Sequence, residues 1–181
     1  MIKRLRYPLP HGIELTCRVT GEPGRPVLLF LHGYPEAAFA WDNLLTHFSK
    51  PEHGGYRCVA PNLRGFADSS SPSELSAYRA KHLVQDVLAL IEAESGSAQL
   101  AALVAHDWGG AIGLGAVLRS PDRFAKLTLF NTGAFPPPFV PLVACPLRFS
   151  VRNSVGQHSP ELPSRSGGWF ISWLVQRFSC N

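Results

Sequence analysis

A single carboxylate, Asp107, lies where an apolar run ends, and it is the side chain of this sequence best placed to do chemistry. The apolar run covers residues 101–105, and a Gly- and Ala-rich stretch of helical pattern begins at Gly109. A strand that turns sharply into a helix pushes one side chain outward, and bulky residues two positions before or after it would collide. Ala105 and Gly109 fit this requirement, and Gly110 allows close packing of the helix on the strand. The pattern predicts an exposed nucleophile at Asp107. The competing interpretation is an ordinary strand–loop–helix junction with a capping Asp.

Two other polar positions follow apolar runs in the same way. Tyr34 comes shortly after the continuously apolar residues 27–31, and Asn131 comes directly after the run at 124–130. In a parallel sheet, functional groups gather at the carboxyl ends of the strands. We therefore expect Tyr34, Asp107 and Asn131 to converge on one edge of a sheet.

The segments that must position these residues alternate between strand and helix patterns. The first two strands are joined by a turn that contains two prolines, and the second of them alternates apolar and polar residues, as a half-buried edge hairpin does. After this hairpin, alternation of strand and helix implies a mostly parallel sheet with helices on both faces, which is an α/β fold. We expect strands at 2–7, 12–20, 27–31, 57–61, 101–105 and 124–130, and helices that begin near 38, at 78 and at 109.

Composition supports a folded domain and excludes some partners. The chain has 181 residues, of which 45% are hydrophobic and 17% charged, so it can bury a core. Its formal charge is +4, but residues 142–181 hold four Arg and one Glu, so the first 141 residues are nearly neutral. No Lys- and Arg-rich cluster with interleaved aromatic residues is present, which argues against a nucleic-acid partner.

Cysteine spacing and hydropathy indicate a soluble, cytoplasmic protein. The four cysteines are far apart and form no Cys-x-x-Cys pair, so we expect buried free thiols and no metal site. No signal peptide is recognisable, and the longest late apolar stretch, 169–178, is too short to span a bilayer. We therefore expect no membrane association. The oligomeric state stays open.

Three motifs together resemble the α/β-hydrolases of the epoxide hydrolase and haloalkane dehalogenase group. The resemblance covers about residues 10–140 and is specific in combination, although Ala105 replaces the first Gly of the usual Gly-His-Asp-Trp-Gly-Gly turn. It implies an α/β-hydrolase fold with an antiparallel N-terminal hairpin. The motifs are His32-Gly33-Tyr34-Pro35-Glu36, Asn62-Leu63-Arg64-Gly65-Phe66-Ala67-Asp68-Ser69 and Ala105-His106-Asp107-Trp108-Gly109-Gly110.

The resemblance also implies a mechanism without a cofactor. Asp107 would attack a carbon of a small apolar epoxide or haloalkane and form an alkyl-enzyme ester, which a His-activated water would hydrolyse. The backbone amides of Tyr34 and Trp108 would stabilise the oxyanion of the second step. Trp108 and Asn131 would contact the substrate or a leaving halide.

Other motif residues have supporting roles by resemblance and geometry. His32 would brace the oxyanion loop and would not transfer protons. His106 is next to the nucleophile on the strand, so its side chain points the other way and a structural role is expected. Four small or rigid residues would shape the site: Gly33, Pro35, Gly109 and Gly110.

The sequence departs from this group after about residue 141. We expect residues 1–141 to form the N-terminal core of the hydrolase domain and residues 142–181 to be an atypical, non-native or poorly ordered tail. The group's cap, its last strands, its catalytic acid and its base His are not found, and His158 lies in a different context, so turnover by this chain is in doubt. Three functions stay open: an epoxide hydrolase, a haloalkane dehalogenase, and a non-catalytic binding protein of the same fold.

Overall fold

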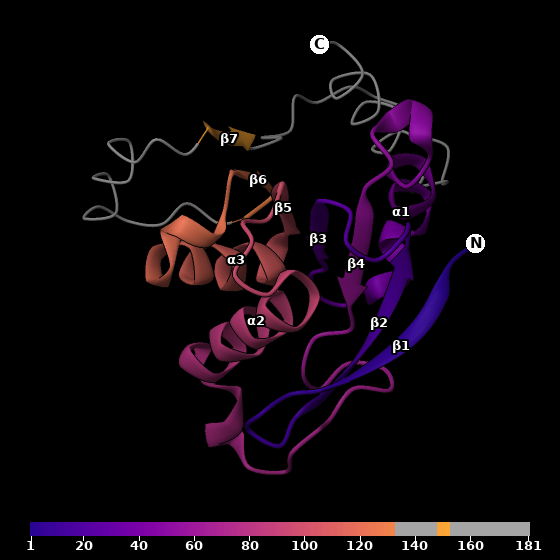
Figure 1. Ribbon diagram of the computed structural model, residues 1–181. Helices are drawn as coiled ribbons and strands as arrows, with labels where there is room; N and C mark the ends of the chain where they lie inside the picture. The colour runs from indigo at the N-terminus through magenta and orange to yellow at the C-terminus, as the bar shows by residue number, and fades with distance from the viewer. Residues whose placement is uncertain (133–147, 153–181) are drawn as a thin grey trace, which may run out of the picture.

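The computed structural model describes residues 1–132 and 148–152, and these form a seven-stranded mixed sheet (Figure 1). The strand order is β1-β2-β4-β3-β5-β6-β7, in which β1, β2 and β4 pair antiparallel and the others parallel. The strands are β1 (Lys3–Pro8), β2 (Glu14–Thr20), β3 (Val27–Leu31), β4 (Arg57–Pro61), β5 (Ala102–His106), β6 (Lys126–Phe130) and β7 (Arg148–Arg152).

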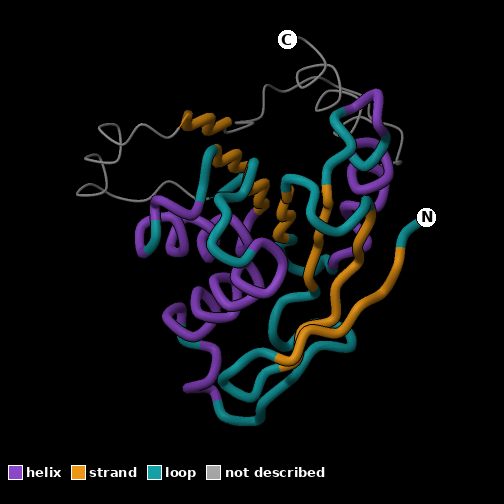
Figure 2. The backbone as a smooth tube through the Cα atoms, in the orientation of Figure 1, coloured by secondary structure: helices purple, strands orange, loops and turns teal. Residues whose placement is uncertain are grey.

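Helices cover both faces of the sheet, as Figures 1 and 2 show. Helices α2 and α3 pack together on one face, and α1 packs on the other face against β2 and β4. The α-helices are α1 (Asp42–Phe48), α2 (Ala80–Ser95) and α3 (Asp107–Arg119). Short 3₁₀ turns are η1 (Ala38–Trp41), η2 (Pro51–His53), η3 (Leu75–Tyr78) and η4 (Pro121–Arg123).

The central strands are buried on both faces because their alternate side chains enter two separate cores. Leu29 and Leu31 of β3 point into the core beneath α2 and α3, whereas Leu28 and Phe30 join the core beneath α1. Strand β5 divides in the same way. This alternation explains why the residues at 27–31 are continuously apolar.

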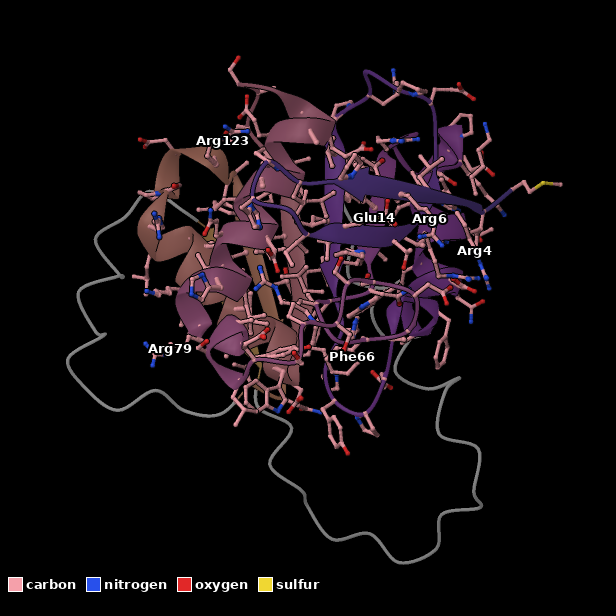
Figure 3. All side chains as sticks on the ribbon, turned by 90° about the horizontal axis from the view of Figure 1, so that it is seen from below. Arg4, Arg6, Glu14, Phe66, Arg79 and Arg123 are labelled. Atoms are coloured by element: carbon pink, nitrogen blue, oxygen red, sulfur yellow. The ribbon has the colours of Figure 1, made fainter. Side chains whose placement is uncertain are left out.

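The N-terminal hairpin closes one edge of the sheet. Strands β1 and β2 pair from Lys3↔Val19 to Pro8↔Glu14, and Arg6 bonds Glu14 across the pair at 2.5 Å (Figure 3). Cys17 of β2 is a buried free thiol, as is Cys58. The predictions of an antiparallel edge hairpin and of free thiols at these two positions are confirmed. The other two cysteines lie outside the described residues.

Most element boundaries agree with the sequence prediction. Strands β3 and β4 have the predicted bounds, and β1, β2, β5 and β6 shift by one or two residues. Helix α3 begins at Asp107, two residues earlier than predicted, because no loop residue separates the end of β5 at His106 from the helix. No helix in the described ranges is long and apolar enough to cross a membrane.

One expectation about the sheet is wrong. We expected the last strand of this chain to be the run at 124–130, but β7 pairs parallel with β6, from Lys126↔Arg148 to Phe130↔Arg152. The sequence of β7 alternates Arg, Phe, Ser, Val and Arg, so it lacks the continuous apolar run by which the other parallel strands are recognised. The rest of the predicted tail at 142–181, including His158, lies outside the described residues, and the domain boundary at 141 stays a prediction.

Candidate active site at the end of strand β5

Asp107 occupies a sharp turn between β5 and α3. Its φ is +51°, in the left-handed region that residues other than glycine rarely adopt. Asp107 is the first residue of α3, whose N-cap position is His106, and its Oδ1 accepts a hydrogen bond from the backbone N–H of Tyr34, with N···O 3.0 Å. The geometry therefore disfavours the capping interpretation and directs this carboxylate away from its own helix.

Strand register brings the three predicted residues to one edge. Leu31 of β3 is opposite Ala105 of β5, and His106 is opposite Phe130 of β6. Tyr34, Asp107 and Asn131 follow these strand ends, so they lie at the same carboxyl edge, as expected. Asn131 is exposed and also has a positive φ, +46°.

Close approach of the backbone explains the glycines around Asp107. A Cβ on Gly33 would lie 2.5 Å from Asp107 Cβ and 2.7 Å from its Oδ1, so the loop that carries Tyr34 could not pass the carboxylate. A Cβ on Gly109 would lie 2.7 Å from the carbonyl oxygen of Leu31. The Tyr34–Pro35 peptide in this loop is cis. The short distances account for Gly at both positions in the predicted motifs.

Gly110 is crowded in a different direction. A Cβ there would overlap Oγ1 of Thr132 and would lie 2.9 Å from Thr132 Cβ, just beyond β6. We expect Gly110→Ala to lower the free energy of unfolding by about 1–3 kcal/mol through overpacking, despite the better helix propensity of Ala. Urea denaturation measures this.

Gly113→Ala in the same helix is the matched control, because its Cβ would approach only side-chain carbons, the nearest being Leu103 Cδ2 at 3.1 Å. Adding Thr132→Ala to Gly110→Ala removes the overlap with Oγ1 and should restore part of the loss. Equal stability of the two single glycine variants would contradict the close packing of α3 on the end of β6.

His32 holds the loop that carries Tyr34. It is fully buried; its Nδ1 lies 2.9 Å from the Gly33 carbonyl oxygen, and its Nε2 accepts the Leu63 N–H at 3.0 Å. A nitrogen that accepts carries no proton, so the ring is neutral with hydrogen on Nδ1. Burial lowers the pKa of His32. Both ring nitrogens are engaged with backbone, which fits the predicted brace and not proton transfer.

The neutral state of His32 predicts a pH effect on stability. Free histidine has a pKa of about 6.5, and the folded value is lower, so only the unfolded chain takes up a proton as pH falls below about 6.5. We expect wild-type stability to decrease in that range. In His32→Gln, which does not titrate, this part of the decrease should be absent. ¹⁵N NMR that finds His32 charged at about pH 6.5 would contradict the assignment.

His106 and Trp108 are the sequence neighbours of Asp107. His106 Nδ1 lies 3.5 Å from Oε2 of Glu36, which is on the loop that carries Tyr34. Trp108 is 60% exposed. The backbone N–H of Trp108 belongs to the first turn of α3, where amides have no partner within the helix. This N–H forms no hydrogen bond with Asp107. The role of Trp108 as second oxyanion donor stays a prediction.

A cavity of about 480 Å³ adjoins this edge of the sheet. Tyr34, whose N–H bonds Asp107, and Trp108, which follows Asp107 in the sequence, both line the cavity. The cavity therefore lies next to Asp107. Its other walls come from the loop after β4, from η3 and from the facing sides of α2 and α3. The lining is mainly apolar and aromatic: Tyr34, Leu63, Arg64, Phe66, Tyr78, Leu83, Trp108 and Ile112.

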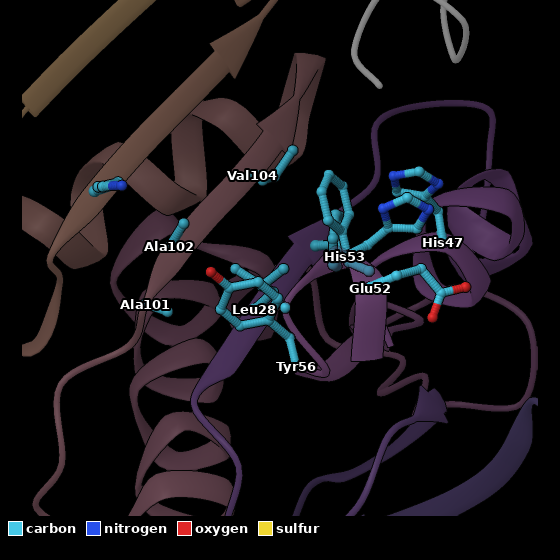
Figure 4. Close-up of a pocket in the computed structure, with 12 residues that line it drawn as sticks. Leu28, His47, Glu52, His53, Tyr56, Ala101, Ala102 and Val104 are labelled. Carbon is cyan, nitrogen blue, oxygen red and sulfur yellow. The ribbon is translucent and has the colours of Figure 1, made fainter. Parts of the chain in front are cut away.

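A second cavity, of about 510 Å³, lies on the opposite face of the sheet (Figure 4). Leu28 and Val104 form part of its floor, and both belong to the core beneath α1. His47 and His53 stack at its rim, with ring centroids 3.7 Å apart. Because the side chains of β3 and β5 alternate, this cavity is separated from Asp107 by the sheet itself.

Comparison with known proteins identifies the class. A sequence model described as the alpha/beta hydrolase fold matches residues 26–149, and the chain belongs to this family. Among its relatives, epoxide hydrolase A of Mycobacterium tuberculosis is 34% identical over 72% of this chain and 39% of its own length. Epoxide hydrolase 3 of Siraitia grosvenorii is 37% identical over 74% of this chain and 40% of its own.

Solved structures agree with these relatives. An epoxide hydrolase of Vigna radiata superposes with a TM-score of 0.67 and 36% identity, over 75% of this chain and 42% of its own. The predicted fold and the resemblance to the epoxide hydrolase group are confirmed. The chain spans about two fifths of the length of these relatives. The dehalogenase alternative and the individual site roles stay predictions.

Part of the cavity was not anticipated from the sequence. Tyr78, Leu83 and Ile112 were assigned to helical segments without a functional role, and the structure places all three around one space next to Trp108. Leu83 and Ile112 sit on helices that face each other, so only the packing of α2 on α3 brings them together. A sequence signal existed for the other lining residues, which all belong to the three motifs of the resemblance: Tyr34, Leu63, Arg64, Phe66 and Trp108.

Proposed function

We propose that this chain carries the nucleophilic half of an epoxide hydrolase site, in which Asp107 opens an epoxide and forms an ester with it. The observation that carries the proposal is the hydrogen bond from the N–H of Tyr34 to Asp107 Oδ1 on a left-handed turn. The names of the relatives support an epoxide as the substrate.

The hydrogen bond assigns different tasks to the two carboxylate oxygens. Because Oδ1 is held by Tyr34, Oδ2 is the oxygen free to attack. Oδ2 forms a bond to one ring carbon of the epoxide, the bond between that carbon and the ring oxygen breaks, and the ring oxygen takes a proton from solvent water. The product is a hydroxyalkyl ester of Asp107, with Oδ1 as its carbonyl oxygen.

The same arrangement suits the second step. Water attacks the ester's carbonyl carbon, and the negative charge that develops on Oδ1 faces the N–H of Tyr34. Removal of one such donor typically costs about 3 kcal/mol of barrier. The water needs a base, and neither His32, locked between two backbone groups, nor His106, paired with Glu36, fits this task. The resemblance assigns the base to a segment that follows the cap.

The proposal is tested by trapping the ester. After incubation of the 181-residue protein with a small epoxide, we expect intact mass spectrometry to show one added epoxide mass, and peptide mapping to place it on Asp107. The ester should accumulate because neither His32 nor His106, the two described histidines near Asp107, is placed to activate the water. Absence of label on Asp107 under conditions where the protein is folded would refute the nucleophile, and multiple turnovers without accumulation would refute the half-reaction.

A further inference from the structure

We propose that the cavity beside Asp107 binds a neutral aryl substituent of the substrate, and that Phe66 and Tyr78 select for it. This inference rests on the proposed function and specifies its substrate class. Its position supports it first. Tyr34 donates to the nucleophile and Trp108 follows it in sequence, and both line the cavity. A group bound there can be attached to a carbon that Asp107 attacks.

The one cation in the lining is already neutralised. Arg64 Nε and Nη2 donate to the two carboxylate oxygens of Asp86, at 2.8 and 2.6 Å, and Nη1 donates to the Ala77 carbonyl at 2.6 Å. Arg64 is 6% exposed and Asp86 2% exposed. All three guanidinium nitrogens already donate, and the positive charge is matched by Asp86, so a carboxylate or phosphate in this cavity would lose water without gaining an unpaired cation.

Tyr78 presents its ring to the cavity rather than its polar atom. The Tyr78 hydroxyl donates to the Pro72 carbonyl at 2.9 Å and lies 3.2 Å from the Ser71 hydroxyl. Its ring packs on Gly65, where an added Cβ would lie 2.8 Å from Tyr78 Cε1. With its hydroxyl occupied and its ring held against the loop, Tyr78 offers the cavity an apolar, planar surface.

Phe66 connects the cavity to the oxyanion loop. It lies on the loop after β4 (Figure 3) and contacts His32 edge to face, with ring centroids 4.8 Å apart. Since His32 fixes the loop that carries Tyr34, the same ring shapes both the substituent pocket and the support of the oxyanion donor. Aromatic rings favour offset or edge-to-face contact with other rings beyond what their area provides. An aryl group should therefore bind better than a saturated ring of similar size.

The test measures rates of ester formation on Asp107 with four glycidyl ethers, which keep the reacting epoxide the same. The ethers carry phenyl, cyclohexyl, 4-carboxyphenyl and methyl groups. We expect the phenyl ether to react about tenfold faster than the cyclohexyl ether, because each contact between aromatic rings adds a small binding energy beyond the area that it buries. The 4-carboxyphenyl compound should react more slowly than phenyl by at least about tenfold.

Variants assign the selectivity to the cavity. In Tyr78→Leu and Phe66→Leu we expect the phenyl-to-cyclohexyl ratio to fall toward one, while the methyl compound, measured on the same variant, reports loss of fold or nucleophile. Tyr56→Leu is the matched control, since Tyr56 lines the cavity on the opposite face and should leave the ratio unchanged.

The outcomes separate the two proposals. If the methyl compound labels Asp107 but phenyl and cyclohexyl react equally, or if 4-carboxyphenyl reacts as fast as phenyl, the aryl pocket is wrong and the nucleophile stands. If the wild-type ratio is high but is unchanged in both Tyr78→Leu and Phe66→Leu, selection occurs elsewhere and the assignment to this cavity is overturned. If no ether labels Asp107, the proposed function fails and the inference fails with it.

Discussion

Asparagine at position 107 is expected to abolish covalent labelling by epoxides, reducing its rate by about 10⁴-fold or more. The neutral amide has no carboxylate oxygen to form the ester. The substitution should preserve the site, because the side-chain oxygen of Asn can still accept the N–H of Tyr34, which donates to Asp107 Oδ1 at 3.0 Å in the wild type. Asn also tolerates the left-handed conformation of this position, φ +51°, better than most uncharged residues other than glycine.

The measurement is intact mass after incubation with the methyl glycidyl ether, with thermal unfolding recorded on the same samples. Asp68→Asn is the matched control, since Asp68 is an exposed carboxylate on the loop after β4 and has no assigned role. It should label as the wild type does. Equal labelling of Asp107→Asn and the wild type would show that the epoxide reacts at another nucleophile and would remove the basis of the proposed mechanism.

Periodicity and motif position were sufficient to predict most of the fold that carries this site. Residues 27–31 are continuously apolar and residues 58–61 are apolar after Arg57, as is typical of strands covered on both faces, and the structure has strands at 27–31 and 57–61. The convergence of Tyr34, Asp107 and Asn131 followed from one rule, that the carboxyl ends of parallel strands share an edge. That rule needs only the order of the elements, which a sequence displays directly.

Features that depend on contact between distant segments could not be predicted in this way. Gly110 was expected to ease packing on its own strand, whereas its tightest neighbour is Thr132 beyond β6, 22 positions along the chain. The ring of Tyr78 lies over Gly65, and its hydroxyl bonds Pro72, which no periodic pattern indicates. Strand β7 was missed because alternation over five residues is too short to distinguish from a loop.

Removal of the carboxylate at Asp86 should produce the largest loss of stability of any single substitution considered for this chain. Asp86 on α2 is the buried partner of Arg64, through two hydrogen bonds of 2.8 and 2.6 Å, and His11 Nε2 also lies 2.6 Å from its Oδ1. Asp86→Ala leaves Arg64 buried and unpaired, for which the expected cost is about 3–5 kcal/mol. Urea denaturation monitored by far-UV circular dichroism measures the loss.

A matched control and a rescue separate the unpaired charge from the lost volume. Glu92→Ala removes the partner of Arg123, bonded at 2.7 Å, but the Glu92 side chain is 64% exposed, so the expected cost is below about 1 kcal/mol. Asp86→Leu combined with Arg64→Met fills the same space without charge and should recover much of the stability lost in Asp86→Ala. The double variant should also keep the selectivity of the cavity beside Asp107 for a neutral ring, since the charge of Arg64 is already matched in the wild type. A cost for Asp86→Ala no greater than that for Glu92→Ala would mean that Arg64 finds water or another partner. The part of the cavity beside Asp107 that Arg64 lines would then be hydrated rather than apolar.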